Sequence, residues 1–192
     1  MTRRILGIDF SGASDAGRRI WIAEGEEAGN RLQLVDLLPA AELEPGAMEP
    51  AAAIAALARH ILADPHTVAG CDFPFSIPRS LIDTPTWADF IASFPTRFAD
   101  ADRFRDWAFR KAGMRELRRR TDAEQQTPFN SYNLRIHRQT WWGIVGLLQP
   151  LLVSGTAVIR PYQPMPRRPK PIVIEACPAC AMKSIGVYPQ YK

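Results

Sequence analysis

The chain has 192 residues, of which 46% are hydrophobic and 23% charged, and its formal net charge is +4. These values are typical of a soluble globular protein. No apolar segment approaches the ~20 residues that a membrane-spanning helix requires, and no signal-peptide pattern precedes the first predicted strand. We therefore expect a single α/β domain over residues 1–192, with a cytoplasmic location and no membrane partner.

The first part of the chain predicts a sheet built from hairpins and followed by a crossover. Short polar turns that contain glycine separate the first three apolar runs and favour antiparallel pairing. Pro50 opens a helix whose apolar spacing is typical of packing against a sheet, and this helix ends before Asp64-Pro65. The strand after it is expected to run parallel to its neighbour. The predicted strands cover residues 4–9, 18–23, 31–38 and 67–73.

The second part of the chain is mainly helical. Residues 160–171 contain five prolines and predict an exposed connector, after which a last strand ends at Glu175. Helices are predicted near residues 86–93, 100–120, 137–152 and 179–184, with a polar loop over 121–133. The whole layout predicts a mixed sheet of three antiparallel strands followed by parallel strands, with flanking helices and a helical insertion at about 79–135.

Three of the predicted strands deliver an acidic residue where an apolar run stops: Asp9, Asp72 and Glu175. Strand ends form the usual ligand crevice of an α/β sheet, so the three carboxylates are expected to meet at one edge. They would repel one another unless a cation lay between them. Oxygen ligands suit Mg²⁺ or Mn²⁺, so we predict a metal site and assign these residues as metal ligands and catalytic groups. For either aspartate alone, a turn at the strand end is the competing interpretation.

Positive charge is concentrated in one segment. Residues 97–138 hold ten arginines and one lysine against six acidic residues, a balance of +5. Arginine forms bidentate pairs with phosphate, so the segment favours a nucleic acid or another phosphorylated partner. A solvated helix face and a genome-wide bias toward arginine are the alternatives. The candidate phosphate-binding residues are Arg115, Arg118, Arg119, Arg120 and Arg135, together with Ser11 in the turn after the first strand.

Two polar residues of the same segment are candidates to complete the site, namely Asp122 and Asn133. A helix cap or an ion pair with a neighbouring arginine is the alternative for Asp122. The three cysteines are too few and too unevenly placed for a disulfide framework. Cys177 and Cys180 have the spacing of a redox pair or half a zinc site, but the sequence has no second half, and we expect ordinary buried thiols.

Five motifs, taken together, resemble an uncharacterised family of predicted ribonuclease H-like nucleases. They are Gly7-Ile8-Asp9-Phe10-Ser11-Gly12-Ala13, Asp72-Phe73-Pro74-Phe75-Ser76-Ile77-Pro78, Arg120-Thr121-Asp122, Asn133-Leu134-Arg135 and Glu175-Ala176-Cys177-Pro178. The resemblance covers nearly the whole chain and implies a ribonuclease H-like fold with divalent metal on Asp9 and Asp72. Glu175 matches the family's own acidic position.

The chain departs from the family pattern in two places. The family usually continues into a final helix with another acidic residue, so either this sequence is truncated or its site is incomplete. The glutamate that ribonuclease H takes from its first helix has no convincing counterpart here, since Glu49 lies at a helix N-terminus.

The function expected from these features is hydrolysis of phosphodiester bonds by a carboxylate-bound divalent metal. Two alternatives remain open. One is a non-catalytic module that binds nucleic acid or nucleotides, and the other is a hydrolase of a small phosphorylated metabolite. The sequence predicts neither the substrate nor the oligomeric state.

Overall fold

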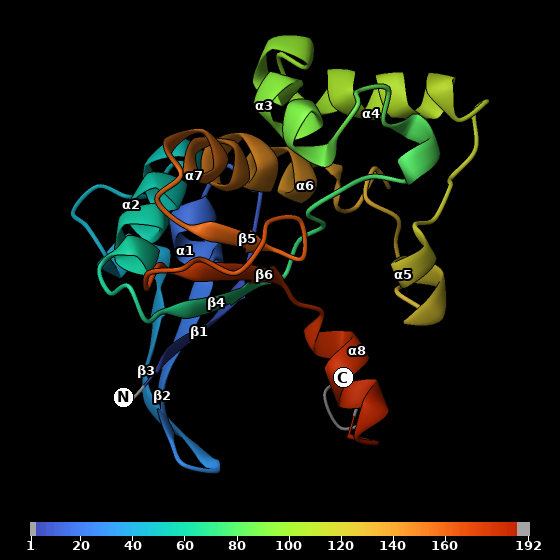
Figure 1. The fold of residues 1–192 in the computed structure, drawn as a ribbon. Coiled ribbons are helices and arrows are strands. Elements are labelled where there is room, and N and C mark those ends of the chain that lie inside the picture. Colours follow the sequence, from blue (N-terminus) through green and yellow to red (C-terminus); the bar gives the residue numbers. More distant parts are fainter. Residues whose placement is uncertain (1–2, 188–192) are drawn as a thin grey trace.

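A computed structural model describes residues 3–187 and shows an α/β fold around a six-stranded mixed sheet (Figure 1). The strand order is β3-β2-β1-β4-β6-β5. The first three strands are antiparallel neighbours, whereas β4 runs parallel to β1 and β6, and β5 runs parallel to β6. The strands are β1 (Arg4–Asp9), β2 (Trp21–Ala28), β3 (Arg31–Pro39), β4 (Val68–Cys71), β5 (Val158–Arg160) and β6 (Ile172–Glu175). The predicted order of antiparallel strands followed by parallel strands is confirmed.

Helices gather on one face of this sheet (Figure 1). The helix that covers its centre, α2 (Pro50–Leu62), buries Ile54, Leu57 and Ile61 against the strands. Its first residue is a proline, which suits the first helical position because the missing N–H would have no partner there. The other helices are α1 (Ala16–Arg19), α3 (Trp87–Arg97), α4 (Ala101–Lys111), α5 (Arg120–Glu124), α6 (His137–Gly143), α7 (Gln149–Ser154) and α8 (Pro178–Ser184), with a π-helical turn, Ile144–Leu148, between α6 and α7 and short 3-10 turns at Ala40–Glu42 and Arg79–Leu81.

The opposite face of the sheet carries small and exposed side chains. Gly7 of β1 pairs with Gly70 of β4 on this face. Leu32 and Leu34 of β3 are 64% and 63% exposed. Within the described part of the chain, no helix lies over this face in Figure 1. In these residues the fold therefore has two layers, the sheet and the helices, and the hydrophobic core lies on the helical side of the sheet.

Several local predictions differ from the structure. Arg18 and Arg19 lie in the short helix α1, and strand β2 begins only at Trp21. The strand β5 was not predicted, because its three residues precede the proline-rich segment. The polar loop contains the short helix α5. The basic helix ends at Lys111, close to Gly113, where an interruption was predicted. Gly113 has a φ of +66°, a left-handed conformation that glycine adopts without strain.

Cys177 and Cys180 form a disulfide, which corrects the expectation of ordinary buried thiols. Their Cα atoms lie 5.3 Å apart, within the usual range for such a bond. Cys71 is a free cysteine and is buried. None of the helices among the described residues is long and apolar enough to span a membrane.

Candidate carboxylate site at the sheet edge

The three predicted carboxylates lie at one edge of the sheet, where three parallel strands end. The register places Ile8 of β1 beside Cys71 of β4, and Cys71 beside Glu175 of β6. The backbone N–H of Asp72 donates to the carbonyl of Ile8 at 2.9 Å, which is a ladder bond of the last β1–β4 pair, Ile8 with Cys71. Asp9 and Asp72 are consequently neighbours on adjacent strand ends, 63 residues apart in the chain.

The carboxylates do not all leave the sheet on the same face. Alternation along β1 places Asp9 on the face of Gly7, and Asp72 follows directly after the end of β4. Glu175 pairs with Cys71 and shares the face that points into the core. The edge therefore has Asp9 on one side and Glu175 on the other, while Asp72 lies beyond the strand end and lines the same cavity as Glu175.

Burial and like charge act together on Asp72. Desolvation is the largest cause that raises the pKa of Asp72, to about 6, and the charges of Asp9 and Glu175 raise it further. Asp9 is more exposed, although partial desolvation also raises the pKa of its carboxyl. The two aspartates thus form a site where a proton or a cation relieves electrostatic repulsion.

The segments that carry both aspartates pack against helix α6. A Cβ atom on Gly12 would lie 2.5 Å from the backbone carbon of Arg138, so only glycine allows this loop to approach the helix so closely. The side-chain amide of Gln139 donates to the carbonyl of Asp72. Gly143 leaves room for the ring of Phe73, which a Cβ atom at that position would meet at 2.4 Å. Helix α6 therefore fixes the two strand ends relative to each other.

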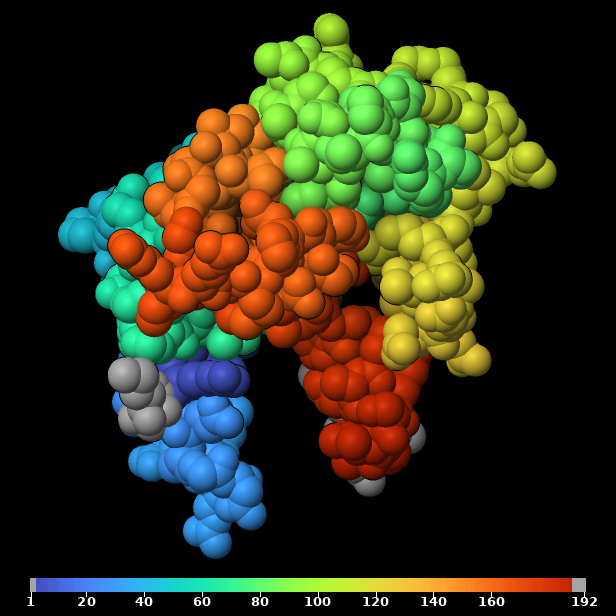
Figure 2. Space-filling model, viewed as in Figure 1, coloured from blue at the N-terminus to red at the C-terminus, as the bar shows by residue number. Residues whose placement is uncertain are grey.

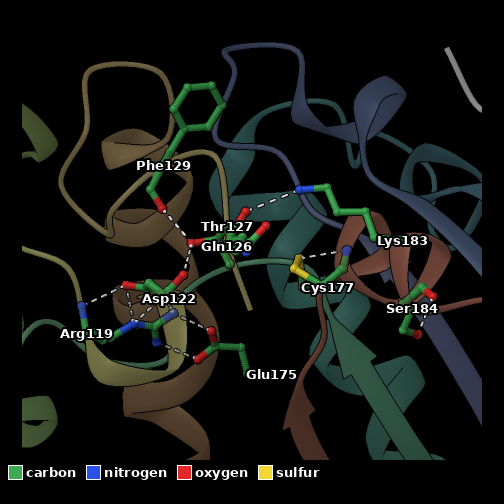
Figure 3. Close-up of a disulfide and its surroundings, with 11 residues drawn as sticks. Arg119, Asp122, Gln126, Thr127, Phe129, Glu175, Cys177, Lys183 and Ser184 are labelled. Atoms are coloured by element: carbon green, nitrogen blue, oxygen red, sulfur yellow. Dashed lines mark hydrogen bonds and ion pairs between the residues drawn. A yellow bond between two sulfur atoms is a disulfide. The ribbon is translucent and has the colours of Figure 1, made fainter. Parts of the chain in front are cut away.

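Glu175 holds a buried arginine (Figure 3). Its two carboxylate oxygens accept hydrogen bonds from Arg119 Nη2 at 2.6 Å and Nη1 at 2.8 Å. The Oε2 atom also accepts from the backbone N–H of Phe75 at 2.9 Å. These three donors hold the glutamate side chain in place at the sheet edge.

Arg119 is shared between two acids. Asp122, whose side chain is only 2% exposed, accepts from Arg119 Nη2 at 2.6 Å and from Nε at 3.0 Å. Burial by itself would lower the pKa of Arg119, but the hydrogen bonds from Glu175 and Asp122 outweigh it and raise that pKa. Two carboxylates facing one guanidinium leave this cluster with a net charge of −1.

A cavity of about 250 Å³ lies beside these groups. Its lining includes Asp72, Glu175, Arg119, Asp122 and Gln139, together with the apolar wall of Phe129. The surface is hollowed between the α5 region and helix α8 (Figure 2). The cavity therefore joins one of the two aspartates to the Arg119 cluster.

Comparison with known proteins finds no match among family models, curated proteins or solved structures.

The residues present fit a divalent ion only in part. Within residues 3–187, no three His, Cys, Asp or Glu side chains are grouped so that they could hold a metal ion. Asp9 and Asp72 supply the hard oxygen donors that Mg²⁺ and Mn²⁺ prefer. Glu175 instead binds Arg119 and the Phe75 N–H, so the predicted three-carboxylate cage is not formed.

The remaining candidates have different roles in the structure. Ser11 Oγ accepts from the N–H of Ala13 at 3.3 Å and closes a local turn. Asn133 donates to Glu116 at 2.8 Å and orders the loop before α6. Of the five candidate arginines, Arg119 is committed to the acidic cluster, whereas four are exposed: Arg115, Arg118, Arg120 and Arg135.

Sequence reasoning missed two features that shape the site. Gln139 carries no motif, and only its place on α6 brings it to Asp72. The alternative that Asp122 pairs with a neighbouring arginine is confirmed by Arg119. The pairing of Arg119 with Glu175 was missed, although the proximity predicted for several carboxylates is itself a signal that a cation must lie among them.

Proposed function

We propose that the chain is a ribonuclease H-like, metal-dependent hydrolase of phosphodiester bonds in which Asp9 and Asp72 bind Mg²⁺ or Mn²⁺. The observation that carries the proposal is the pair of aspartates at the adjacent ends of β1 and β4. Such a pair leaves two negative charges in a partly buried position, which a divalent cation would neutralise. When bound, the ion supplies a nucleophile at neutral pH and offsets the charge of the phosphodiester.

In this proposal the protein's own groups have three roles. Asp72 must be deprotonated to bind the cation, and its raised pKa makes this step depend on pH near neutrality. Gln139 and the close contact at Gly12 keep the segments of the two aspartates in place against α6. Glu175 acts as the anion that positions Arg119, and Arg119 in turn balances the buried Asp122.

A polymeric substrate is favoured over a small metabolite. The cavity that Asp72 lines, at about 250 Å³, is below the ~300–1,000 Å³ of typical pockets for small molecules. A neighbouring cavity of about 430 Å³ shares Arg119 and Glu175 with it, but Asp72 is not part of its lining. Exposed arginines on the segment that includes α5 could contact flanking phosphates, since Arg115 and Arg118 have no ion pair among the described residues. A nucleic acid that places one phosphodiester at the aspartates and others along this segment fits both features.

Cleavage of labelled single-stranded RNA and DNA with Mn²⁺ or Mg²⁺ tests the proposal. Asp72→Asn and Asp9→Asn are each expected to lower the rate by at least about 100-fold, because either change removes a charged ligand. Asp36→Asn is the matched control, since Asp36 is an exposed carboxylate on β3. Equal cleavage by the wild type and Asp72→Asn would remove the proposal. Metal-independent, salt-sensitive binding without cleavage would instead support the non-catalytic module.

A further inference from the structure

The Cys177–Cys180 disulfide joins two residues of one short segment (Figure 3). It lies at the start of α8 and encloses only Pro178 and Ala179. A cross-link restricts the unfolded chain less when its loop is short, and this one connects no distant elements. The bond is therefore expected to stabilise the fold less than a disulfide that closes a long loop.

The two sulfurs differ in access. Cys177 is partly exposed and lines both the cavity beside Asp72 and a second cavity of about 430 Å³. Cys180 is only 8% exposed and lines the second cavity but not the first. Since thiol–disulfide exchange requires in-line approach to one sulfur, the approach is open chiefly at Cys177.

The second cavity is large enough for a small thiol. It is lined by both cysteines and Ser184 of the α8 region and by Gln125 and Tyr162 of other segments, and its volume lies within the usual range for small-molecule sites. The neighbouring Arg119 is already neutralised by Asp122 and Glu175. The cavity therefore offers no free cation and suits a neutral or zwitterionic thiol better than a strongly acidic one.

We propose that Cys177 and Cys180 form a reversible thiol–disulfide exchange site that reacts with small thiols through Cys177. An incoming thiolate attacks Cys177 Sγ, the S–S bond breaks, and Cys180 leaves as a thiolate that takes a proton from water. A second thiol then attacks the sulfur of the first, which releases Cys177 as a thiol. Two electrons and two protons pass to the protein, and the two small thiols become one disulfide. This inference does not depend on the proposed hydrolysis.

The third cysteine provides an internal reference for counting thiols. Cys71 is fully buried in β4, and burial raises the pKa of its thiol, so it is not expected to react in the folded protein. In the oxidised protein a colorimetric thiol reagent should detect no thiol under native conditions and only Cys71 in denaturant. After dithiothreitol is added and removed, Cys177 and Cys180 should both react natively, and all three cysteines of the chain should react in denaturant.

Single variants test which sulfur is attacked. With the neutral hydroxyethyl disulfide, Cys180→Ser is expected to gain one mercaptoethanol at Cys177, whereas Cys177→Ser should react at least about tenfold more slowly through the buried Cys180. Intact-mass spectrometry measures both, and Cys71→Ala is the control that should leave the native counts unchanged. The proposal would be overturned by equal rates for the two variants or by reduction only in denaturant. Failure of hydroxyethyl disulfide to restore the bond in the reduced wild type would overturn it as well.

Discussion

Arg119 and Glu175 lie 56 residues apart in the chain and form two hydrogen bonds, of 2.6 and 2.8 Å. The pair connects the segment before α5 to the end of β6, two elements that share no sheet contact. Asp122 completes the cluster from the first turn of α5. This contact joins the basic segment to the sheet edge. It also occupies both carboxylate oxygens of Glu175 with a largely buried guanidinium, so that Glu175 serves as the partner of Arg119.

Replacing Arg119 is expected to destabilise the fold. Arg119→Gln leaves the buried Asp122 without its counter-charge, and removing one partner of a buried pair costs about 3–5 kcal/mol. We expect the free energy of unfolding, measured in urea, to fall by about 3 kcal/mol. This is the lower end of the range, because Glu175 is 30% exposed and can be solvated. Arg120→Gln is the matched control, because the Arg120 side chain is 90% exposed and its pair with Glu124 should contribute less than about 1 kcal/mol. Equal effects of the two variants would contradict a buried role for Arg119.

The stability of the protein should depend on Asp72 in a defined pH window. A raised pKa means that the native state holds its proton more tightly than the unfolded state, so stability falls as pH rises from about 4 to above 6. Asp72→Asn removes the cost of ionising this carboxyl in the folded protein. The variant should therefore be more stable than the wild type by about 1–2 kcal/mol at pH 7.5, after allowance for partial solvation. The advantage should disappear near pH 4. Urea unfolding at both pH values measures it, and a constant difference would show that the effect is not ionisation.

Divalent cations should stabilise the protein through the two aspartates. A ligand that binds only the folded state raises stability by RT ln(1 + [L]/Kd), so millimolar Mn²⁺ should raise the melting temperature at pH 7.5. The increase should shrink below pH 6, where protons compete for Asp72. Asp72→Asn should abolish it, whereas Asp36→Asn should retain it. A shift that survives in Asp72→Asn would place the cation elsewhere.

Exposed arginines should determine the salt dependence of nucleic-acid binding. Each phosphate contact that is removed should lower the slope of log K against log salt by about 0.7–0.9. The double variant Arg115→Gln/Arg118→Gln is therefore expected to weaken binding and to reduce that slope by about 1.5. Arg31→Gln on β3 serves as the control for net charge alone, and fluorescence anisotropy from 50 to 300 mM salt gives the slopes. An unchanged slope in the double variant would exclude these arginines from the interface.

Local patterns predicted the strands that carry the site. The apolar runs before Asp9, Asp72 and Glu175 were identified as strands, and their common edge follows from parallel pairing. The helix that begins at Pro50 was also predictable, because its spacing and its opening proline are local signals. The strand β5 was missed, since three residues are too few to show a period.

The sequence by itself determined which residues are acidic and where each strand stops, because apolar runs and turn residues act over a few positions. Only the tertiary structure decided how those acids are used. The register that sets Glu175 beside Cys71 turns its carboxylate toward Arg119, whereas Asp9 lies on the other face of the sheet. A shift of one residue in that register would move Glu175 to the face of Asp9, and no pattern within a single strand specifies such a choice.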